Sequence, residues 1–191
     1  MSLSSSIPAY LITVREASLL SPPERTATIL PAEAADMPDI WSCQWSILWE
    51  QVYEPTEAIV KLTHNGELLG LVKFALYPSR TNPSQMEFAE VMNIETLAKQ
   101  GRAFNLVASW LIWYVCLIAI ERCQGNNLGQ ILTLVSVESA IEYYQDRVKM
   151  EGLGWITIAP NEDGYAFAFS KTAAKQFCTR IESRYGTPKL L

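Results

Sequence analysis

The sequence predicts an α/β fold built as a single domain, and three observations carry this prediction. β-rich runs and segments with helical spacing follow one another along the chain, and an Asn65-Gly66 pair joins two of the β-rich runs. Residues 103–120 carry no charge, which predicts a helix that is apolar on nearly all sides. With 191 residues, the chain is long enough to bury a sizeable core.

The amino-acid composition and charge argue against several classes of function. The net charge is −5 and the Lys and Arg residues are scattered, which argues against a nucleic-acid partner. The four cysteines lack CxxC spacing and His64 is the only histidine, so we expect reduced thiols and no metal site. The first residues lack the basic and apolar pattern of a secretory leader. A cytoplasmic location is therefore expected.

The N-terminal third predicts two strands and a helix. Residues 9–16 and 25–30 are β-rich, and Pro22 and Pro23 separate them. Apolar residues at spacings of three and four predict an amphipathic helix over residues 36–51, started by Asp36 and Pro38.

Residues 57–63 and 67–76 predict a β-hairpin. Asn65-Gly66 is the pair that a type I′ turn requires, because both central residues need positive φ. His64 then lies at the edge of the turn, a position for which we expect no catalytic role. A loop over 77–85 and a strand over 86–94 follow.

The apolar segment 103–120 has two interpretations. Eighteen uncharged residues lie at the short end of the range for a membrane span, which is roughly 17–25 residues. The flanks, Arg102 on one side and Glu121-Arg122 on the other, give little basic asymmetry. We therefore favour the central helix of a soluble domain, whose N-terminus could offer backbone N–H groups to an anion.

The C-terminal third continues the alternation of elements. Residues 131–137 form a nearly continuous apolar run, which predicts a strand that is covered on both faces. A helix over 138–149, strands over 152–158 and 165–169, and a final helix over 170–184 follow. Ser170 or Thr172 is the predicted N-cap of the final helix.

The order of these elements resembles the GNAT superfamily of acyl-CoA N-acyltransferases over residues 25–169. The resemblance implies a central mixed, mostly antiparallel sheet with helices on both faces, that is, an α/β (α+β) fold. It divides the chain into an N-terminal extension (1–24), an acyltransferase domain (25–170) and a C-terminal helix and tail (171–191).

One stretch that carries the resemblance is residues 91–108. In this superfamily a loop of pattern (Gln/Arg)-x-x-Gly-x-(Gly/Ala) precedes a helix whose N-terminus binds the CoA pyrophosphate. Here Arg102 keeps the basic position, whereas Asn105 and Val107 replace both small residues, so the motif is degenerate. The resemblance implies these acyl-CoA-binding residues: Val91, Met92, Arg102, Ala103, Phe104 and Asn105.

The other stretch is residues 136–155, which contains Ala140-Ile-Glu-Tyr143-Tyr144 and then Gly154-Trp155. Tyr144 matches the tyrosine that protonates the departing CoA thiolate, and a phenol is a suitable general acid for that step. Residues 145–153 are longer than the corresponding segment of the superfamily. The general base is expected on or near the strand over 86–94. Glu87, Glu90 and Glu95 are available there, and we favour Glu90.

The leading hypothesis for function is therefore a GNAT-like enzyme that binds acetyl-CoA or another acyl-CoA as co-substrate. It would transfer the acyl group to a small-molecule or peptide amine by direct attack, with no metal, nucleic-acid or membrane partner. The first alternative is an inactive GNAT-like binding or assembly module. A membrane-associated protein is the second alternative, and a homodimer stays open.

Overall fold

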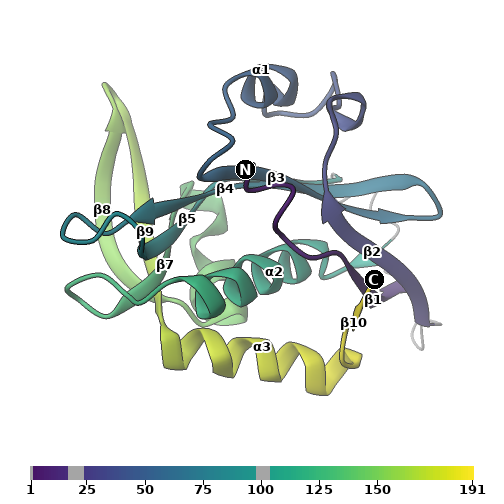
Figure 1. Ribbon diagram of the computed structural model, residues 1–191. Coiled ribbons are helices and arrows are strands. Elements are labelled where there is room, and N and C mark those ends of the chain that lie inside the picture. The colour runs from purple at the N-terminus through teal and green to yellow at the C-terminus, as the bar shows by residue number, and fades with distance from the viewer. Residues whose placement is uncertain (1, 17–23, 98–103) are drawn as a thin grey trace. The chain divides into compact units, whose positions relative to one another are not determined.

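The computed structural model describes residues 2–16, 24–97 and 104–191, and its contacts divide the chain into two compact units. Unit 1 comprises Met1–Phe74, Asn93–Tyr114 and Ile181–Leu191, and unit 2 comprises Ala75–Met92 and Val115–Arg180. Each unit is described by itself below. Among the described elements, β4, β5, α2 and α3, which Figure 1 labels, each begin in one unit and end in the other.

In the described ranges, the strands hydrogen-bond in the order β10-β1-β2-β3-β4-β5-β7-β9-β8, and β6 pairs with β1. β5 and β7 are parallel, whereas the pairs β1–β2, β2–β3, β7–β9 and β8–β9 are antiparallel. This confirms the mixed, mostly antiparallel sheet. The strands are β1 Tyr10–Glu16, β2 Glu24–Pro31, β3 Glu57–His64, β4 Glu67–Pro78, β5 Met86–Thr96, β6 Phe104–Asn105, β7 Gln130–Ser136, β8 Glu151–Ala159, β9 Glu162–Ser170 and β10 Lys189–Leu190.

In unit 1 the hairpin between β3 and β4 has the predicted turn. Asn65 has a φ of 50° and Gly66 a φ of 82°, as a type I′ turn requires. His64 ends β3, where its Nδ1 donates to the Thr26 carbonyl at 2.7 Å. The imidazole therefore ties the turn to the neighbouring strand, which confirms the expected turn-edge position.

Helices cover both faces of β4 within unit 1. Leu71 packs on one face in a buried cluster with Trp45 of helix α1 (Trp45–Glu50). Gly70 faces the other side, where an added Cβ would lie 2.7 Å from Val107 Cγ1 of helix α2 (Val107–Arg122). The absence of a side chain at residue 70 lets the helix approach the strand closely.

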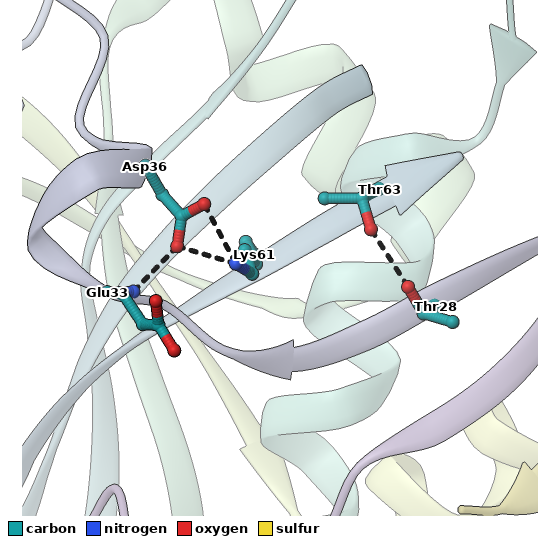
Figure 2. Close-up of polar contacts among 5 residues, drawn as sticks. All are labelled: Thr28, Glu33, Asp36, Lys61 and Thr63. Carbon is teal, nitrogen blue, oxygen red and sulfur yellow. Dashed lines mark hydrogen bonds and ion pairs between the residues drawn. The ribbon is translucent and has the colours of Figure 1, made fainter. Parts of the chain in front are cut away.

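The predicted helix over residues 36–51 is wrong in its extent. The segment contains the end of a 3₁₀ turn, η1 (Ala34–Asp36), and the short helix α1, with residues 37–44 outside helix. Figure 2 shows the contacts of Asp36 that explain why this residue does not begin a long helix. Its carboxylate accepts a hydrogen bond from the Glu33 N–H at 2.6 Å and pairs with Lys61 Nζ at 2.6 and 2.8 Å. The side chain that would cap a helix is therefore bonded elsewhere.

Helix α2 begins at Val107 rather than at residue 103, and its residues 110–116 are buried on every side of the helix. Its larger polar groups have partners in unit 1. Trp110 Nε1 donates to the Thr13 carbonyl at 3.0 Å, and the Tyr114 hydroxyl donates to the Pro8 carbonyl at 2.6 Å. No helix in the described part of the chain combines the length and apolar character that crossing a membrane requires.

In unit 2, β7 lies between β5 and β9, and helix α3 (Lys171–Tyr185) follows β9 directly. Ser170 Oγ accepts the Ala173 N–H at 3.2 Å, so Ser170 is the N-cap of α3 and Thr172 is not. The predicted helix over 138–149 consists of a 3₁₀ turn, η2 (Glu138–Ala140), and a π-helix, η3 (Tyr143–Val148).

The ends of the chain contribute strands to unit 1. β1 lies in the predicted extension and β10 in the predicted tail, and the two pair antiparallel through Tyr10↔Leu190 and Leu11↔Lys189. The division into segments 1–24, 25–170 and 171–191 stays a prediction.

Candidate functional site

The candidate site lies in unit 2, where the parallel ladder between β5 and β7 ends. The ladder pairs Ala89 with Leu132, Glu90 with Thr133 and Val91 with Leu134. β5 continues beyond Val91, and the next residue, Met92, is 39% exposed. The Met92 backbone thus follows the last residue of the ladder with β7.

The register separates the predicted site residues onto two faces of the sheet. Directly paired residues point to the same side, so Val91, Leu134 and Phe167 share one face. Glu90 pairs with Thr133, which pairs with Ala168 of β9, and these residues share the opposite face.

Tyr144 lies over the face that contains Val91. It is buried in η3, with its ring centroid 5.6 Å from that of Phe167 and 5.2 Å from that of Tyr143. Burial, and secondarily Tyr143, raises the pKa of the Tyr144 hydroxyl above its ordinary value. The phenol is therefore protonated at neutral pH, which is the form that a proton donor requires.

Arg180 of α3 fixes the end of η3. Its Nη2 donates to the carbonyl oxygens of Arg147 at 3.2 Å and of Val148 at 2.8 Å. Terminal carbonyls of a helix lack partners within the helix, and the guanidinium supplies one here. At the same end of η3, the Met150 N–H donates to the Tyr144 carbonyl at 3.1 Å. Tyr144 is thus held in a short π-helix that is bonded at its end.

Arg180 is a residue that sequence reasoning missed. It lies on the final helix, and neither its spacing nor its neighbours connects it with Tyr144. The longer segment over residues 145–153 is a signal for the π-helix itself, because π-turns insert extra residues into a helix, but it does not point to Arg180.

Glu90 is half-buried on the face opposite Tyr144. Glu95 instead has a structural role in unit 1, where its carboxylate accepts hydrogen bonds. Glu95 Oε1 accepts the Ser42 N–H at 2.6 Å, and Oε2 accepts the Cys43 N–H and the Trp45 indole N–H, both at 2.9 Å. Burial alone would raise the pKa of Glu95, but the hydrogen bonds outweigh it and the pKa is lowered. An ionised carboxylate with three donors is poorly suited to act as a general base.

The Cys43 thiol beside Glu95 is not an activated nucleophile. Burial, followed by the charge of Glu95, raises the pKa of Cys43 to about 11. The thiol form therefore predominates at neutral pH. Across the described residues, no group of three or more His, Cys, Asp or Glu side chains is placed to hold a metal ion.

A cavity of about 430 Å³ lies elsewhere in unit 2, beside the β4–β5 loop. Glu87 lines it, whereas Glu90, Val91, Met92 and Tyr144 do not. Its lining residues come from two loops and the beginning of β5: Ser79, Arg80, Thr81, Glu87, Phe88, Asn126 and Asn127. The cavity is therefore distinct from the candidate site.

The predicted pyrophosphate turn is described only in part. Arg102 and Ala103 lie outside the described residues. Phe104 and Asn105 form β6, which pairs with Arg15 and Glu16 of β1 in unit 1. Phe104 is buried with its ring centroid 4.7 Å from that of His64, whereas Asn105 is exposed. Their roles toward acyl-CoA stay predictions.

Comparison with known proteins finds similar structures but no match by sequence. No family model matches the sequence, and no curated protein matches it. Mycobacterium smegmatis RimJ, solved with CoA-disulfide, aligns with a TM-score of 0.59 at 9% identity, over 96% of this chain and 98% of its own.

Two further solved structures align over most of the chain. Arabidopsis thaliana Naa50, bound to a bisubstrate analogue, CoA-Ac-MVNAL, has a TM-score of 0.54 at 13% identity and covers 75% of this chain and 98% of its own. Aminoglycoside acetyltransferase AAC(6')-Ib, bound to coenzyme A and kanamycin, has a TM-score of 0.55 at 8% identity and covers 78% and 98%. The chain has the fold of the GNAT acetyltransferases, as the order of its elements predicted.

Proposed function

We propose that this protein is an N-acyltransferase that takes an acyl group from acetyl-CoA or another acyl-CoA and transfers it to an amine. One observation carries the proposal: the buried, protonated Tyr144 packs on Phe167. Phe167 pairs with Leu134, which forms the last residue pair of the β5–β7 ladder with Val91. The fold, shared with CoA-bound acetyltransferases over 98% of their length, supports it.

The backbone of β5 fits the amide-containing arm of an acyl-CoA. The β7 ladder ends at Val91, and an extended ligand with amide groups can pair with the edge of a strand. Val91 and Met92 would bind this arm. Arg102, Ala103, Phe104 and Asn105 would take the phosphates, since the N-terminus of a helix favours anions.

The acyl-CoA supplies an activated thioester. In the proposed reaction the amine nitrogen attacks the thioester carbon, the new C–N bond forms and the C–S bond breaks. Glu90 takes a proton from the amine, and Tyr144 gives a proton to the sulfur. Because Glu90 and Tyr144 lie on opposite faces of the sheet, the reacting carbon would lie near the plane of the sheet, beyond the end of the ladder.

We propose only the chemical class of the acceptor, an amine. One structural relative is bound to an analogue that carries a peptide sequence and another to kanamycin, so the fold accommodates peptide and small-molecule acceptors alike. We propose an amine of either kind and a cytoplasmic location. Nucleic acid, a membrane and a metal are not part of the proposed activity.

Thermal unfolding in the presence of acetyl-CoA tests the proposal. A ligand that binds only the folded state stabilises it by about 2.7 kcal/mol at 100 times its Kd. The melting temperature should therefore rise with acetyl-CoA concentration and stay unchanged with ATP, the control nucleotide. An unchanged melting temperature at millimolar acetyl-CoA would contradict acyl-CoA binding.

An inactive GNAT-like binding module is the second candidate. Two observations favour it: the replacement of both small residues in the pyrophosphate motif, and the pairing of Phe104 and Asn105 with β1. A thermal shift with acetyl-CoA, together with no CoA release across a panel of peptide and aminoglycoside amines, would support the module over the enzyme.

A further inference from the structure

The cavity beside the β4–β5 loop is built from two loops of unit 2, at the end of the sheet where β5 begins (Figure 1). One loop, residues 79–85, joins β4 to β5, and the other, residues 123–129, joins α2 to β7. The volume of about 430 Å³ lies within the range of small-molecule sites, which is roughly 300–1,000 Å³. All of the lining residues belong to unit 2, so the cavity is defined within a single unit.

Hydrogen bonds hold both loops in place. The Ser79 N–H donates to the Gln85 carbonyl at 2.8 Å, which closes the loop between β4 and β5. The Gly125 N–H donates to the Glu87 carbonyl at 2.8 Å, which ties the second loop to the beginning of β5. Within that second loop, Asn126 Oδ1 accepts two backbone N–H groups at 3.0 Å each. The walls are therefore formed before a ligand arrives, and binding does not require them to become ordered.

Two opposite charges line the cavity without neutralising each other. Arg80 is exposed and Glu87 is half-buried, and both are lining residues. Within the described residues, neither side chain forms an ion pair or a hydrogen bond, whether with the other or with a third group. The guanidinium and the carboxylate can therefore both bind a ligand in the same cavity.

This pair of charges selects a class of ligand. Glu87 would repel an anion that carries no positive charge, and Arg80 would repel a simple cation. A guanidinium binds a carboxylate through two parallel hydrogen bonds, and a carboxylate accepts hydrogen bonds from an ammonium group. The exposed Asn127 adds an amide that can donate or accept a hydrogen bond. A small molecule with one carboxylate and one ammonium group therefore satisfies both charges at once.

We propose that this cavity binds a small zwitterion, an α-amino acid or a dipeptide, with its carboxylate on Arg80 and its ammonium group on Glu87. The site is separate from that of the proposed acyl transfer. Glu87 precedes Val91 by four residues on β5, a distance of about 13 Å at the rise of a β-strand. None of the described residues assigned to acyl transfer lines the cavity. Zwitterion binding is thus a function in addition to acyl transfer.

Isothermal titration calorimetry of the full chain with the standard L-α-amino acids, and with glycyl-leucine as a dipeptide, tests the proposal. Each ligand that binds is compared with its N-acetyl form, which lacks the ammonium group, and with its amide, which lacks the carboxylate. Each of these changes should weaken binding by about ten- to a hundredfold, because one charged contact is lost. Amino acids and dipeptides differ in the separation of their charges, so the class that binds more tightly identifies the ligand.

Two variants locate the binding at this cavity. Arg80→Gln and Glu87→Gln should each weaken binding of the zwitterion by about ten- to a hundredfold, because each removes one of the two charges. Both variants should keep the wild-type melting temperature, since neither side chain has a partner to lose within the described residues. Arg25→Gln on β2 and Glu67→Gln on β4 are matched controls outside the cavity and should bind like the wild type.

The contact between Arg80 and the carboxylate has a further test. In Arg80→Gln the parent ligand and its amide should bind equally, because the contact that amidation removes is already absent. No heat of binding at millimolar ligand, equal binding of the parent and its N-acetyl or amide form to the wild type, or wild-type affinity in either Arg80→Gln or Glu87→Gln would overturn the proposal. None of these measurements involves acyl-CoA, so their failure would leave the proposed acyl transfer untouched.

Discussion

Glu95 connects two parts of unit 1 that are 53 residues apart in the chain, because its carboxylate accepts the Ser42 N–H. It also binds the Cys43 N–H and the Trp45 indole. Hydrogen bonds to a charged acceptor are stronger than those between neutral groups, so Glu95 contributes to the position of α1.

Glu95→Gln should lower the free energy of unfolding by about 1–2 kcal/mol at pH 7, because charge-assisted hydrogen bonds become neutral ones. The pKa of Glu95 is lowered in the folded state. Its stabilisation is thus complete above the unfolded pKa, about 4.3, and is lost as pH falls through the folded value.

Urea unfolding at pH 7 and at pH 3 measures this effect. The difference between wild type and Glu95→Gln should shrink at the lower pH. Glu67→Gln, at an exposed residue of β4, serves as the control and should change stability little at either pH. A difference that stays constant across this range would exclude the charged contact as its cause.

Tyr144→Phe should lower kcat by about 10²- to 10⁴-fold and leave the acetyl-CoA thermal shift intact, because only the proton is removed. Since the pKa of Tyr144 is raised above its ordinary value of about 10, the wild-type rate should not fall from loss of this proton between pH 8 and pH 10. Steady-state kinetics across this range provide the measurement.

Tyr143→Phe is the matched control for Tyr144, since both residues lie in η3 with their rings in contact. Its kcat should stay close to the wild-type value. A Tyr144→Phe enzyme with wild-type kcat would remove Tyr144 as the general acid, whatever acetyl-CoA binding shows.

At the scale of elements, Ser170 sets the beginning of α3. Ser170→Ala should lower the free energy of unfolding by about 1 kcal/mol, because the Ala173 N–H loses its acceptor. Thr172→Ala, at the other candidate cap, should change stability much less. Equal losses for the two variants in urea unfolding would contradict the assigned cap.

The elements that the sequence predicted best are those with local causes. The β3–β4 hairpin follows from Asn65-Gly66 between two β-rich runs, and the strands follow from their composition. The predicted helix over 36–51 is wrong because Glu95 and Lys61, which are distant in sequence, bind Ser42, Cys43 and Asp36. Local spacing contains no information about such partners.

The candidate site could likewise be predicted only in part. Tyr144 follows from the order of elements and from the paired tyrosines, and the structure places it on the Val91 face of the sheet. Arg180 could not be predicted, because its bonds to Arg147 and Val148 join segments more than 30 residues apart. Alternation along the strand could not exclude Glu95, because it does not reveal hydrogen-bond partners.

At the scale of the whole molecule, the order of elements predicted the fold although sequence identity with RimJ is only 9%. Hydrophobic pattern and turn chemistry persist where individual residues change. The pairing of β1 with β10 was beyond such reasoning. Two-residue and terminal strands carry too little pattern to reveal their partners.

Helix α2 has a consequence for how the chain tolerates substitution. Seven consecutive residues, 110–116, are each 2% exposed or less, so nearly two turns of the helix have no solvent-facing side. In a library of random single substitutions, polar residues should be depleted at every one of these positions, without helical periodicity. α3, which alternates buried and exposed residues, should show tolerated positions at intervals of three and four.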